Sequence, residues 1–354
     1  KRILRSRWFP WSLTAVTLLF LVLAILAGFF GTRVGNRNFS IVFVWIVWWA
    51  LLILLLIPFA GRLWCAMCPI PAPGEWLQRR ALVKPRPGAR LYTLGRKWPR
   101  RLRNIWVQNA GILIVALFSV VILTNPAITA LVLALFVVVA LGISLVFERR
   151  TFCRYLCPVG GFIGLYSQVA PVEIRVKDAA ICASHKEKTC YTGSDAGYGC
   201  PWLLFPGILQ ANTFCGLCTE CLKTCPKDNM ALFLRLPGTD LWQTKGHKLD
   251  EAYKGFIMLA SALVYSAVLI GPWGALKEAA RAVGSTAWLA YAAAFLALSL
   301  LVVPGLFWLS VRLGQGRSPT PPRVLFAGYA TVLVPLGLTA WMAFSLSFVL
   351  ANLS

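Results

Sequence analysis

Long apolar runs that alternate with short basic loops dominate this chain. The runs cover residues 11–30, 41–60, 105–123, 127–147, 255–270, 287–313 and 324–350. A helix of about 20 mostly apolar residues crosses the roughly 30 Å hydrocarbon core of a bilayer. The pattern therefore predicts a membrane all-α helical bundle of about seven transmembrane helices in contact with a lipid bilayer. The first run is too long for a cleaved signal peptide and lacks a small-residue cleavage site.

One long stretch between the apolar runs is too polar to cross a membrane. It is rich in Cys, Gly and polar residues, and we expect it to form a domain inserted between the fourth and fifth helices. The predicted division is residues 1–60 for helices one and two, 61–104 for a basic loop with a first Cys pair, 105–147 for helices three and four, 148–254 for a second Cys pair and the inserted domain, and 255–354 for helices five to seven.

The strongly basic balance of the chain lies in its loops. The formal net charge is +23, and the loop 61–104 contains many Lys and Arg with Glu75 as its one acidic residue. Lys and Arg in short loops mark the cytoplasmic side of a membrane protein. We therefore expect a multi-pass protein of the cell inner (cytoplasmic) membrane, with the N-terminus and the inserted domain in the cytoplasm. No folded basic surface remains outside the spans, so nucleic acid is excluded as a partner.

A short motif occurs twice, each time where an apolar run ends on the cytoplasmic side. The sequence is R-L-W-C-A-M-C-P at residues 62–69 and R-T-F-C-R-Y-L-C-P at residues 150–158. Each half of this repeat is an out-and-back helix pair that ends in Arg, an aromatic residue, two Cys and Pro. Because the two halves have the same polarity, we expect both motifs side by side at the membrane surface.

The strongest chemical signal is the run Cys215, Cys218, Cys221 and Cys225, followed by Pro. This is the C-x2-C-x2-C-x3-C-P spacing of bacterial ferredoxins, whose first three Cys bind one 4Fe-4S cluster and whose fourth binds another. The spacing predicts a ferredoxin-like domain in which Cys200, which also precedes Pro, completes cluster one. The alternative is a zinc knuckle, which prefers two separated pairs of ligands.

A second cluster requires ligands upstream of that run, and a stretched half-motif supplies them. Cluster two is predicted to take Cys182, Cys190 and Cys225. His185 stands where the second Cys of the half-motif belongs, and imidazole replaces thiolate on iron in Rieske centres. We therefore assign His185 as the fourth ligand. The alternatives are a three-iron cluster, or ligation by Asp195 or water.

The two helix-end motifs offer four further thiols, namely Cys65, Cys68, Cys153 and Cys157. Cytoplasmic thiols stay reduced, so grouped Cys there hold metal more often than disulfides. The four thiols together can hold a third iron–sulfur cluster at the membrane surface, where a quinone headgroup would lie. A structural zinc ion, a redox-active dithiol pair and simple buried Cys are the alternatives.

At these residues the chain resembles the membrane polyferredoxins of the NapH and NosR type. The resemblance covers roughly residues 41–236, and F-C-R-Y-L-C-P-V-G at 152–160 is its most specific motif. It implies membrane-bound electron transfer between the quinone pool and a respiratory or maturation partner. The chain departs from the family in the shorter spacing of Cys65 and Cys68, in His185 replacing Cys, and in three additional spans after the ferredoxin domain.

A quinone site has no reliable sequence motif. Our candidate is His247, which lies just before the run 255–270 next to three charged residues, Lys248, Asp250 and Glu251. The alternative for this group is a solvated flank of the span. Gln108 and Asn109 are further candidates, although capping and helix packing explain them as well. Neither His of this chain lies within a span, which excludes a transmembrane b-type haem.

These observations predict an electron-transfer subunit that carries electrons through two or three 4Fe-4S clusters between quinone and a partner redox protein. No nucleophile or acid–base arrangement is visible, so substrate chemistry is expected on partner subunits, as in a quinol dehydrogenase complex. One alternative is a membrane maturation or regulatory factor that supplies electrons to a metalloenzyme centre or senses its redox state. Another is an anchor that only docks a catalytic subunit.

Overall fold

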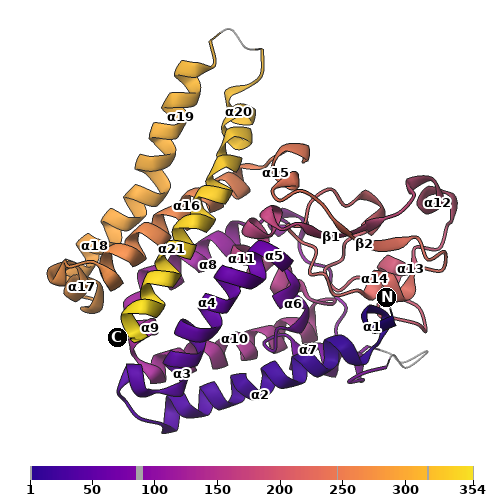
Figure 1. The fold of residues 1–354 in the computed structure, drawn as a ribbon, viewed down its shortest axis with the longest axis horizontal. Helices are drawn as coiled ribbons and strands as arrows, with labels where there is room; N and C mark the ends of the chain where they lie inside the picture. Colours follow the sequence, from indigo (N-terminus) through magenta and orange to yellow (C-terminus); the bar gives the residue numbers. More distant parts are fainter. Residues whose placement is uncertain (1, 85–90, 245, 317–318, 354) are drawn as a thin grey trace. The chain divides into compact units, whose positions relative to one another are not determined.

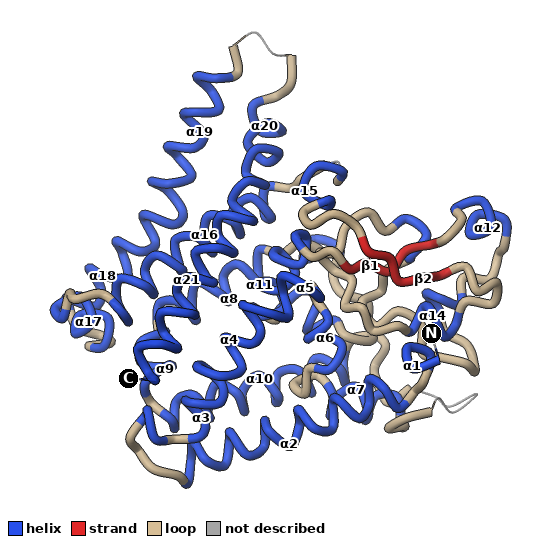
Figure 2. Tube along the Cα trace, in the orientation of Figure 1, coloured by secondary structure: helices blue, strands red, loops and turns tan. Residues whose placement is uncertain are grey.

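The computed structural model describes residues 2–84, 91–244, 246–316 and 319–353. Figure 1 shows a mostly helical chain, and Figure 2 shows its two strands in red. Among the described residues, six helices are long and apolar enough to cross a membrane: Trp8–Phe30, Phe39–Ala60, Pro126–Val146, Leu249–Ile270, Thr286–Gly314 and Pro322–Asn352. The prediction of a multi-pass membrane helical bundle is confirmed, and the number of spans is close to the expected seven.

The apolar run 105–123 differs from the prediction of one continuous span. It forms helix α8 (Trp106–Leu117) and helix α9 (Ser119–Thr124), which are separated at Phe118 by a local change of backbone angles to φ −98° and ψ 9°. Average hydropathy over a window is insensitive to such a break, because most of the residues on both sides of it are apolar. The sequence pattern therefore located the apolar segment correctly and missed its interruption.

The described residues form two compact units. Unit 1 contains residues 1–23, 56–103 and 133–240, and unit 2 contains residues 24–55, 104–132 and 241–354. Unit 1 includes these elements: α1 (Arg2–Arg5), the start of α2 (Trp8–Phe30), α5 (Ile57–Ala60), α6 (Leu63–Met67), α7 (Ala72–Arg79), the end of α10 (Pro126–Val146), α11 (Pro158–Tyr166), β1 (Val172–Val176), α12 (Ala179–Ser184), α13 (Thr189–Thr192), α14 (Glu220–Thr224) and β2 (Met230–Leu234).

Unit 2 contains most of the remaining helices. They are α3 (Phe39–Ile41), α4 (Trp49–Leu51), α8, α9, α16 (Leu249–Tyr265), α17 (Gly274–Arg281), α18 (Thr286–Ala297), α19 (Val303–Gly314), α20 (Pro322–Tyr329) and α21 (Leu333–Leu353), while α15 (Thr239–Gln243) begins in unit 1 and ends in unit 2. Helices α16 and α21 lie side by side in Figure 1 and are in contact. The buried Trp341 indole N–H of α21 donates to the Met258 carbonyl of α16 at 3.0 Å.

A small antiparallel sheet organises the polar part of unit 1. Strands β1 and β2 pair with Val172 opposite Leu234 and Val176 opposite Met230. Ile174 and Met230 are buried against Leu222 of α14. Because β2 follows the Cys215–Cys225 run and β1 precedes the half-motif, the sheet ties the two Cys-bearing segments into one hydrophobic core.

Beside this sheet, buried charges are paired. Asp240 has a side-chain exposure of only 1% and accepts a hydrogen bond from the Asn212 backbone N–H at 2.7 Å. Its carboxylate also pairs with Arg235, and Glu173 pairs with Arg235 at 2.8 Å and Arg175 at 3.2 Å. A buried carboxylate is tolerated only when such partners compensate for its lost hydration.

Candidate metal centres

Four of the predicted ligands surround one cavity in unit 1. Cys200, Cys215, Cys218 and Cys221 line it together with the aromatic ring of Trp202. They come from the loop before α14, from the first turn of α14, and from the segment after α13. The structure therefore brings together the four thiols that the sequence assigns to cluster one, although residues 200 and 215 are well separated along the chain.

The backbone around this cavity adopts left-handed angles at residues that have side chains. The φ angle is 50° at Leu217, 62° at Thr219 and 55° at Leu203. Such angles are uncommon for residues other than Gly. Alternating right- and left-handed residues turn successive N–H groups toward one point and create concavities for anions, including iron–sulfur clusters. This geometry is what an anionic cluster held by four thiolates needs.

Two buried polar atoms in the same cavity have no hydrogen-bond partner in the described part of the chain. They are the indole Nε1 of Trp202, whose residue is 1% exposed, and the hydroxyl Oγ1 of Thr219. Buried donors of this kind are rare without a partner. Cluster sulfurs accept hydrogen bonds that influence the potential. The cavity therefore offers four thiols and two unused donors, a set that fits a 4Fe-4S cluster.

Gly216 keeps the Trp202 ring at this cavity. A Cβ atom at position 216 would lie 2.1 Å from Cη2 of the indole. Any side chain there would displace the ring. Gly216, the first of the two residues between Cys215 and Cys218, thus has a packing role that the motif alone does not reveal.

The three thiols assigned to cluster two also lie close together. Burial raises the pKa of Cys190 to about 11, and the neighbouring Cys182 and Cys225 add to the effect. The Thr189 hydroxyl donates to the Thr224 carbonyl at 2.6 Å and so links α13 to the end of α14. Thiols with raised pKa values must lose protons when they bind metal, and metal binding supplies the energy for that loss.

His185 is half-buried at the end of α12, where its Nδ1 lies 2.9 Å from the Ile181 carbonyl oxygen. A carbonyl accepts, so this contact places the ring proton on Nδ1 and leaves the lone pair on Nε2. Metal-binding His residues characteristically donate their second nitrogen to such a group. The alternative ligand, Asp195, is exposed in a turn. This geometry suits His185 as a ligand, and its ligation of cluster two stays a prediction.

The four helix-end thiols form a third group. Burial raises the pKa of Cys153, and the neighbouring thiols Cys157, Cys68 and Cys65 raise it further, against the opposing charge of Arg150. Burial likewise raises the pKa of Cys157 to about 11. The repeat thus places its two Cys pairs in one cluster of side chains, as the matching polarity of the two hairpins predicts.

Every Cys-Pro cysteine has a backbone N–H close to its sulfur. The Cys157 sulfur accepts from Gly160 at 3.2 Å, Cys200 from Leu204 at 3.4 Å, and Cys225 from Asn229 at 3.3 Å. The Ile70 backbone has the same effect on Cys68 and lowers its pKa, against a larger increase that burial causes. Because proline lacks an N–H and turns the chain, the next free amides reach the sulfur. The same local device recurs in all three thiol groups.

The thiols are not arranged around a single ion. All 11 cysteines lie among the described residues and none is in a disulfide. Within the part of the chain that the structure describes, no three His, Cys, Asp or Glu side chains are close enough to hold one metal ion. A zinc site gathers its thiolates about 2.3 Å from one centre, whereas a cubane distributes them over four irons.

Buried arginines connect the helix-end thiols to the cavity of cluster one. Arg150 donates to Glu75 at 2.9 and 2.6 Å and also to the Cys65 carbonyl, and its guanidinium lies 4.9 Å from the Trp202 ring centroid. Arg62, 1% exposed, donates to the Cys153 carbonyl at 3.1 Å. The roles of Trp202 and Glu75 were missed by sequence reasoning. The one signal for Glu75 was its position as the lone acid in a basic loop.

Two further arginines hold the segment that contains Cys200. Arg149 donates to the carbonyls of Tyr191 at 2.5 Å and Cys200 at 2.6 Å. Arg154 donates to the Leu203 carbonyl at 2.8 Å and to the Trp202 carbonyl. The second helix-end motif therefore supports the backbone of a cluster-one ligand in addition to supplying its own thiols.

Comparison with known proteins agrees with this chemistry. The sequence profile of a family described as a 4Fe-4S binding domain matches residues 41–101 and 129–177. This chain resembles the membrane polyferredoxins. The match includes Cys65, Cys68, Cys153 and Cys157 and ends before Cys182, so it falls on the helix-end pairs. The chain is therefore similar to a 4Fe-4S binding domain at the helix-end pairs, outside the ferredoxin-type run.

A curated relative from Escherichia coli (strain K12) bears the name "Putative electron transport protein YccM". It is 27% identical to this polyferredoxin-like chain over 136 residues, which are 38% of this chain and 34% of that protein. The chain thus spans about a third of the length of the curated relative it matches. No solved structure matches the chain.

The sequence candidates for a quinone site lie in unit 2. Burial lowers the pKa of His247, against a smaller opposing effect of the Thr244 backbone. Asp250 accepts from the Ile105 backbone N–H at 3.0 Å, and Asn109 donates to the Asp250 carbonyl at 2.9 Å. Lys254, 2% exposed, donates to Gln108 at 3.0 Å. Gln108 and Asn109 thus act as packing partners of α16, the alternative that the sequence left open.

Proposed function

We propose that this protein is a membrane electron carrier that passes electrons through three 4Fe-4S clusters between the quinone pool and a partner redox protein. The proposal depends on one observation above all. The guanidinium of Arg150 lies within electrostatic reach of both Cys153 of the helix-end group and Cys218 of the cluster-one group. Arg150 also donates to the Cys65 carbonyl, and it lies 4.9 Å from the ring of Trp202, which lines the cluster-one cavity; these contacts support two neighbouring centres in one relay.

The ligand assignment follows from the side chains that meet in unit 1. Cys200, Cys215, Cys218 and Cys221 would hold cluster one around their common cavity. Cluster two would take Cys182, His185, Cys190 and Cys225, and the third cluster would take the four helix-end thiols. Bound clusters supply one-electron transfer. The chain supplies thiolates, amide and indole N–H donors and buried guanidinium groups, which stabilise the anionic clusters and so influence their potentials.

The quinone end of the relay is supported by where the thiols lie along the chain. Both helix-end motifs come shortly after apolar spans, Phe39–Ala60 and Pro126–Val146. A cluster there would stand at the level of quinone headgroups. The basic loops support a position for this surface on the cytoplasmic side of the inner membrane, and a soluble or membrane-attached redox partner would then dock from the cytoplasm.

Metal analysis of anaerobically purified protein tests the proposal. About twelve irons and twelve acid-labile sulfides per chain are expected for three cubanes, each with four irons, and about eight for two. EPR of the reduced protein should resolve the separate centres. Addition of a quinol analogue should reduce at least one of them.

Other results would contradict parts of this proposal. Protein that contains zinc, or no metal, would end the redox interpretation. If dithionite reduces the clusters and no quinol analogue does, the protein is still an electron carrier but quinone is not its electron donor. A maturation factor that receives electrons from another donor would behave in this way.

A further inference from the structure

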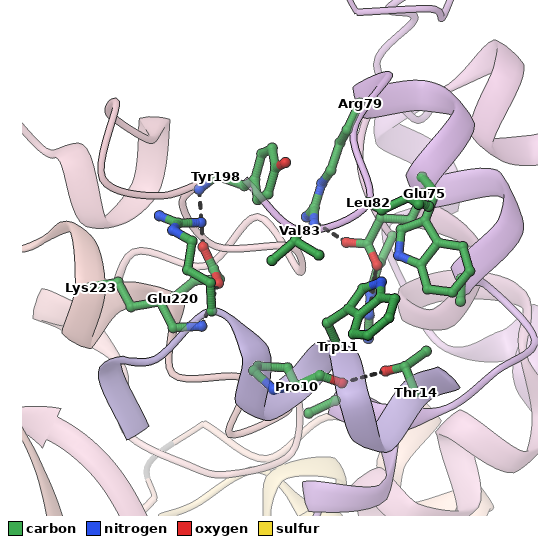
Figure 3. Close-up of a pocket in the computed structure, with 15 residues that line it drawn as sticks. Pro10, Trp11, Thr14, Glu75, Arg79, Leu82, Val83, Tyr198, Glu220 and Lys223 are labelled. Atoms are coloured by element: carbon green, nitrogen blue, oxygen red, sulfur yellow. Dashed lines mark hydrogen bonds and ion pairs between the residues drawn. The ribbon is translucent and has the colours of Figure 1, made fainter. Parts of the chain in front are cut away.

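A pocket in unit 1 lies beside the thiol groups and has no role in the ligation described above. Its lining comes from the first turns of α2, from α6 and α7, from Tyr198, and from α14. Figure 3 shows Trp11, Glu75 and Arg79 on one side of the pocket and Tyr198, Glu220 and Lys223 on the other. Ala66, which also lines it, stands between Cys65 and Cys68, and Glu220 precedes Cys221.

Three buried donor atoms of this pocket have no hydrogen-bond partner among the described residues. They are Nε1 of Trp11, the hydroxyl of Tyr198 and Nη2 of Arg7. Each such group costs about 1–3 kcal/mol when it is buried and unpaired. Three unpaired donors on residues that line one pocket indicate a ligand with acceptor oxygens.

The carboxylates of the pocket are already paired and are not available as partners for a cation. Glu75 binds Arg150 at 2.6 Å and also binds Arg79. Glu220 binds Lys223 at 2.9 Å and accepts from the Tyr198 backbone N–H at 3.0 Å. Burial alone would raise the pKa of Glu75, but the two arginines lower it, which keeps the pair charged. Two of the three unused donors, the indole and the phenol, are uncharged, which favours a neutral ligand.

The position of the pocket indicates an amphiphilic ligand. Its lining includes the first turns of α2, a helix long and apolar enough to cross a membrane. Apolar side chains that continue along this helix, such as Leu13, Val16 and Phe20, are exposed. The aromatic rings of Trp11 and Trp76 line the pocket itself. A flat ring with carbonyl oxygens and an apolar tail matches the donors, the rings and the helix surface together.

We propose that this pocket binds the headgroup of a quinone, whose carbonyl oxygens accept hydrogen bonds from the Trp11 indole and the Tyr198 hydroxyl. This assignment rests on the proposed function and adds its site. It places the headgroup against residues that adjoin both the helix-end thiols and Cys221. His247, the residue that the sequence favoured, lies in the other unit and serves as the comparison.

Binding measurements with single-atom changes test the site. Trp11→Phe and Tyr198→Phe each remove one donor and keep the aromatic ring. Trp273→Phe and Tyr92→Phe are the matched controls, because both residues are exposed and neither lines the pocket. Titration calorimetry of the oxidised, cluster-loaded protein in detergent, with decylubiquinone and with menadione, gives the Kd. Iron content and cluster absorption show whether each variant has folded.

Each pocket variant should weaken quinone binding about three- to tenfold, the effect of one lost hydrogen bond, while both controls bind like the unaltered protein.

Unchanged Kd values in both pocket variants would overturn the site. So would variants that lose bound phosphatidylglycerol and keep their quinone affinity, because the pocket would then hold an anionic lipid headgroup. If only His247→Ala weakens binding, the site is wrong while the proposed function stands. If the unaltered protein binds no quinone and no quinol reduces its clusters, the quinone part of the function fails as well.

Discussion

Replacing Trp202 by Phe should lower the reduction potential of cluster one and of no other cluster. The indole lines the cavity formed by the four cluster-one thiols, it is 1% exposed, and its N–H has no partner among the described residues. A donor aimed at sulfur stabilises the additional negative charge of the reduced cluster. Removing it therefore favours the oxidised state and lowers the potential.

The size of the change follows from the value of one hydrogen bond. A net contribution of about 0.5–1.5 kcal/mol corresponds to about 20–60 mV for a one-electron couple, since a tenfold change in equilibrium is about 59 mV. Arg150 and Arg62, whose guanidinium groups lie 4.9 and 6.0 Å from the Trp202 ring centroid, remain in both proteins. The smaller ring of Phe also leaves space that water can enter, so packing needs its own control.

Redox titration monitored by EPR measures this potential, and the other clusters in the same sample serve as internal references. Replacing the Trp202 indole by its benzothiophene analogue keeps the bicyclic ring and removes only the N–H. It should reproduce the lower potential without the loss of volume. A potential of cluster one that stays within error in both proteins would refute a hydrogen bond from Trp202 to the cluster.

Three further predictions concern other parts of unit 1. Cys153→Ser should lower the iron content by about four per chain and leave the spectra of the ferredoxin-type clusters intact; retention of all iron would show that the helix-end thiols hold no cluster. His185→Ala should change the EPR spectrum and potential of cluster two only, as measured by redox titration, and unchanged spectra would remove it as a ligand. Asp240→Ala removes one of the two carboxylates that pair with Arg235 and leaves the buried Asn212 backbone N–H without its acceptor, so it should destabilise the domain by about 1–3 kcal/mol, seen as earlier loss of cluster absorption on chemical denaturation; an unchanged midpoint would contradict this account.

The sequence predicted the membrane helices and the grouping of the thiols well, for physical reasons. An apolar run long enough to span a bilayer is rarely anything other than a transmembrane helix. The spacing of Cys215, Cys218 and Cys221 is typical of ligands of a 4Fe-4S cluster. Cys200 could be assigned to the same group because the Cys before Pro in each half of a two-cluster ferredoxin motif binds the cluster of the other half. The structure places these thiols around one cavity.

Other features depend on contacts between distant residues and carry no local signal. Nothing in the sequence around Trp202 or Glu75 shows that one faces a thiol cavity and the other pairs with Arg150. The interruption of the third apolar run at Phe118 lies in a segment that is apolar on average, so mean hydropathy does not register it. The pocket beside Trp11 combines five separate segments of the chain, and its donors become visible only once the fold brings them together.

The hydrogen bonds from Arg149 and Arg154 to the carbonyls of residues 191–203 have a practical consequence. A water-soluble fragment cut out after residue 170 would lose both side chains and, with them, the support for the segment that contains Cys200. Such a fragment would keep the Cys215–Cys225 run and still load cluster one poorly. Any excised redox module of this protein should therefore retain residues 148–158, even though they adjoin the lipid, and should be compared with the full-length chain for iron content.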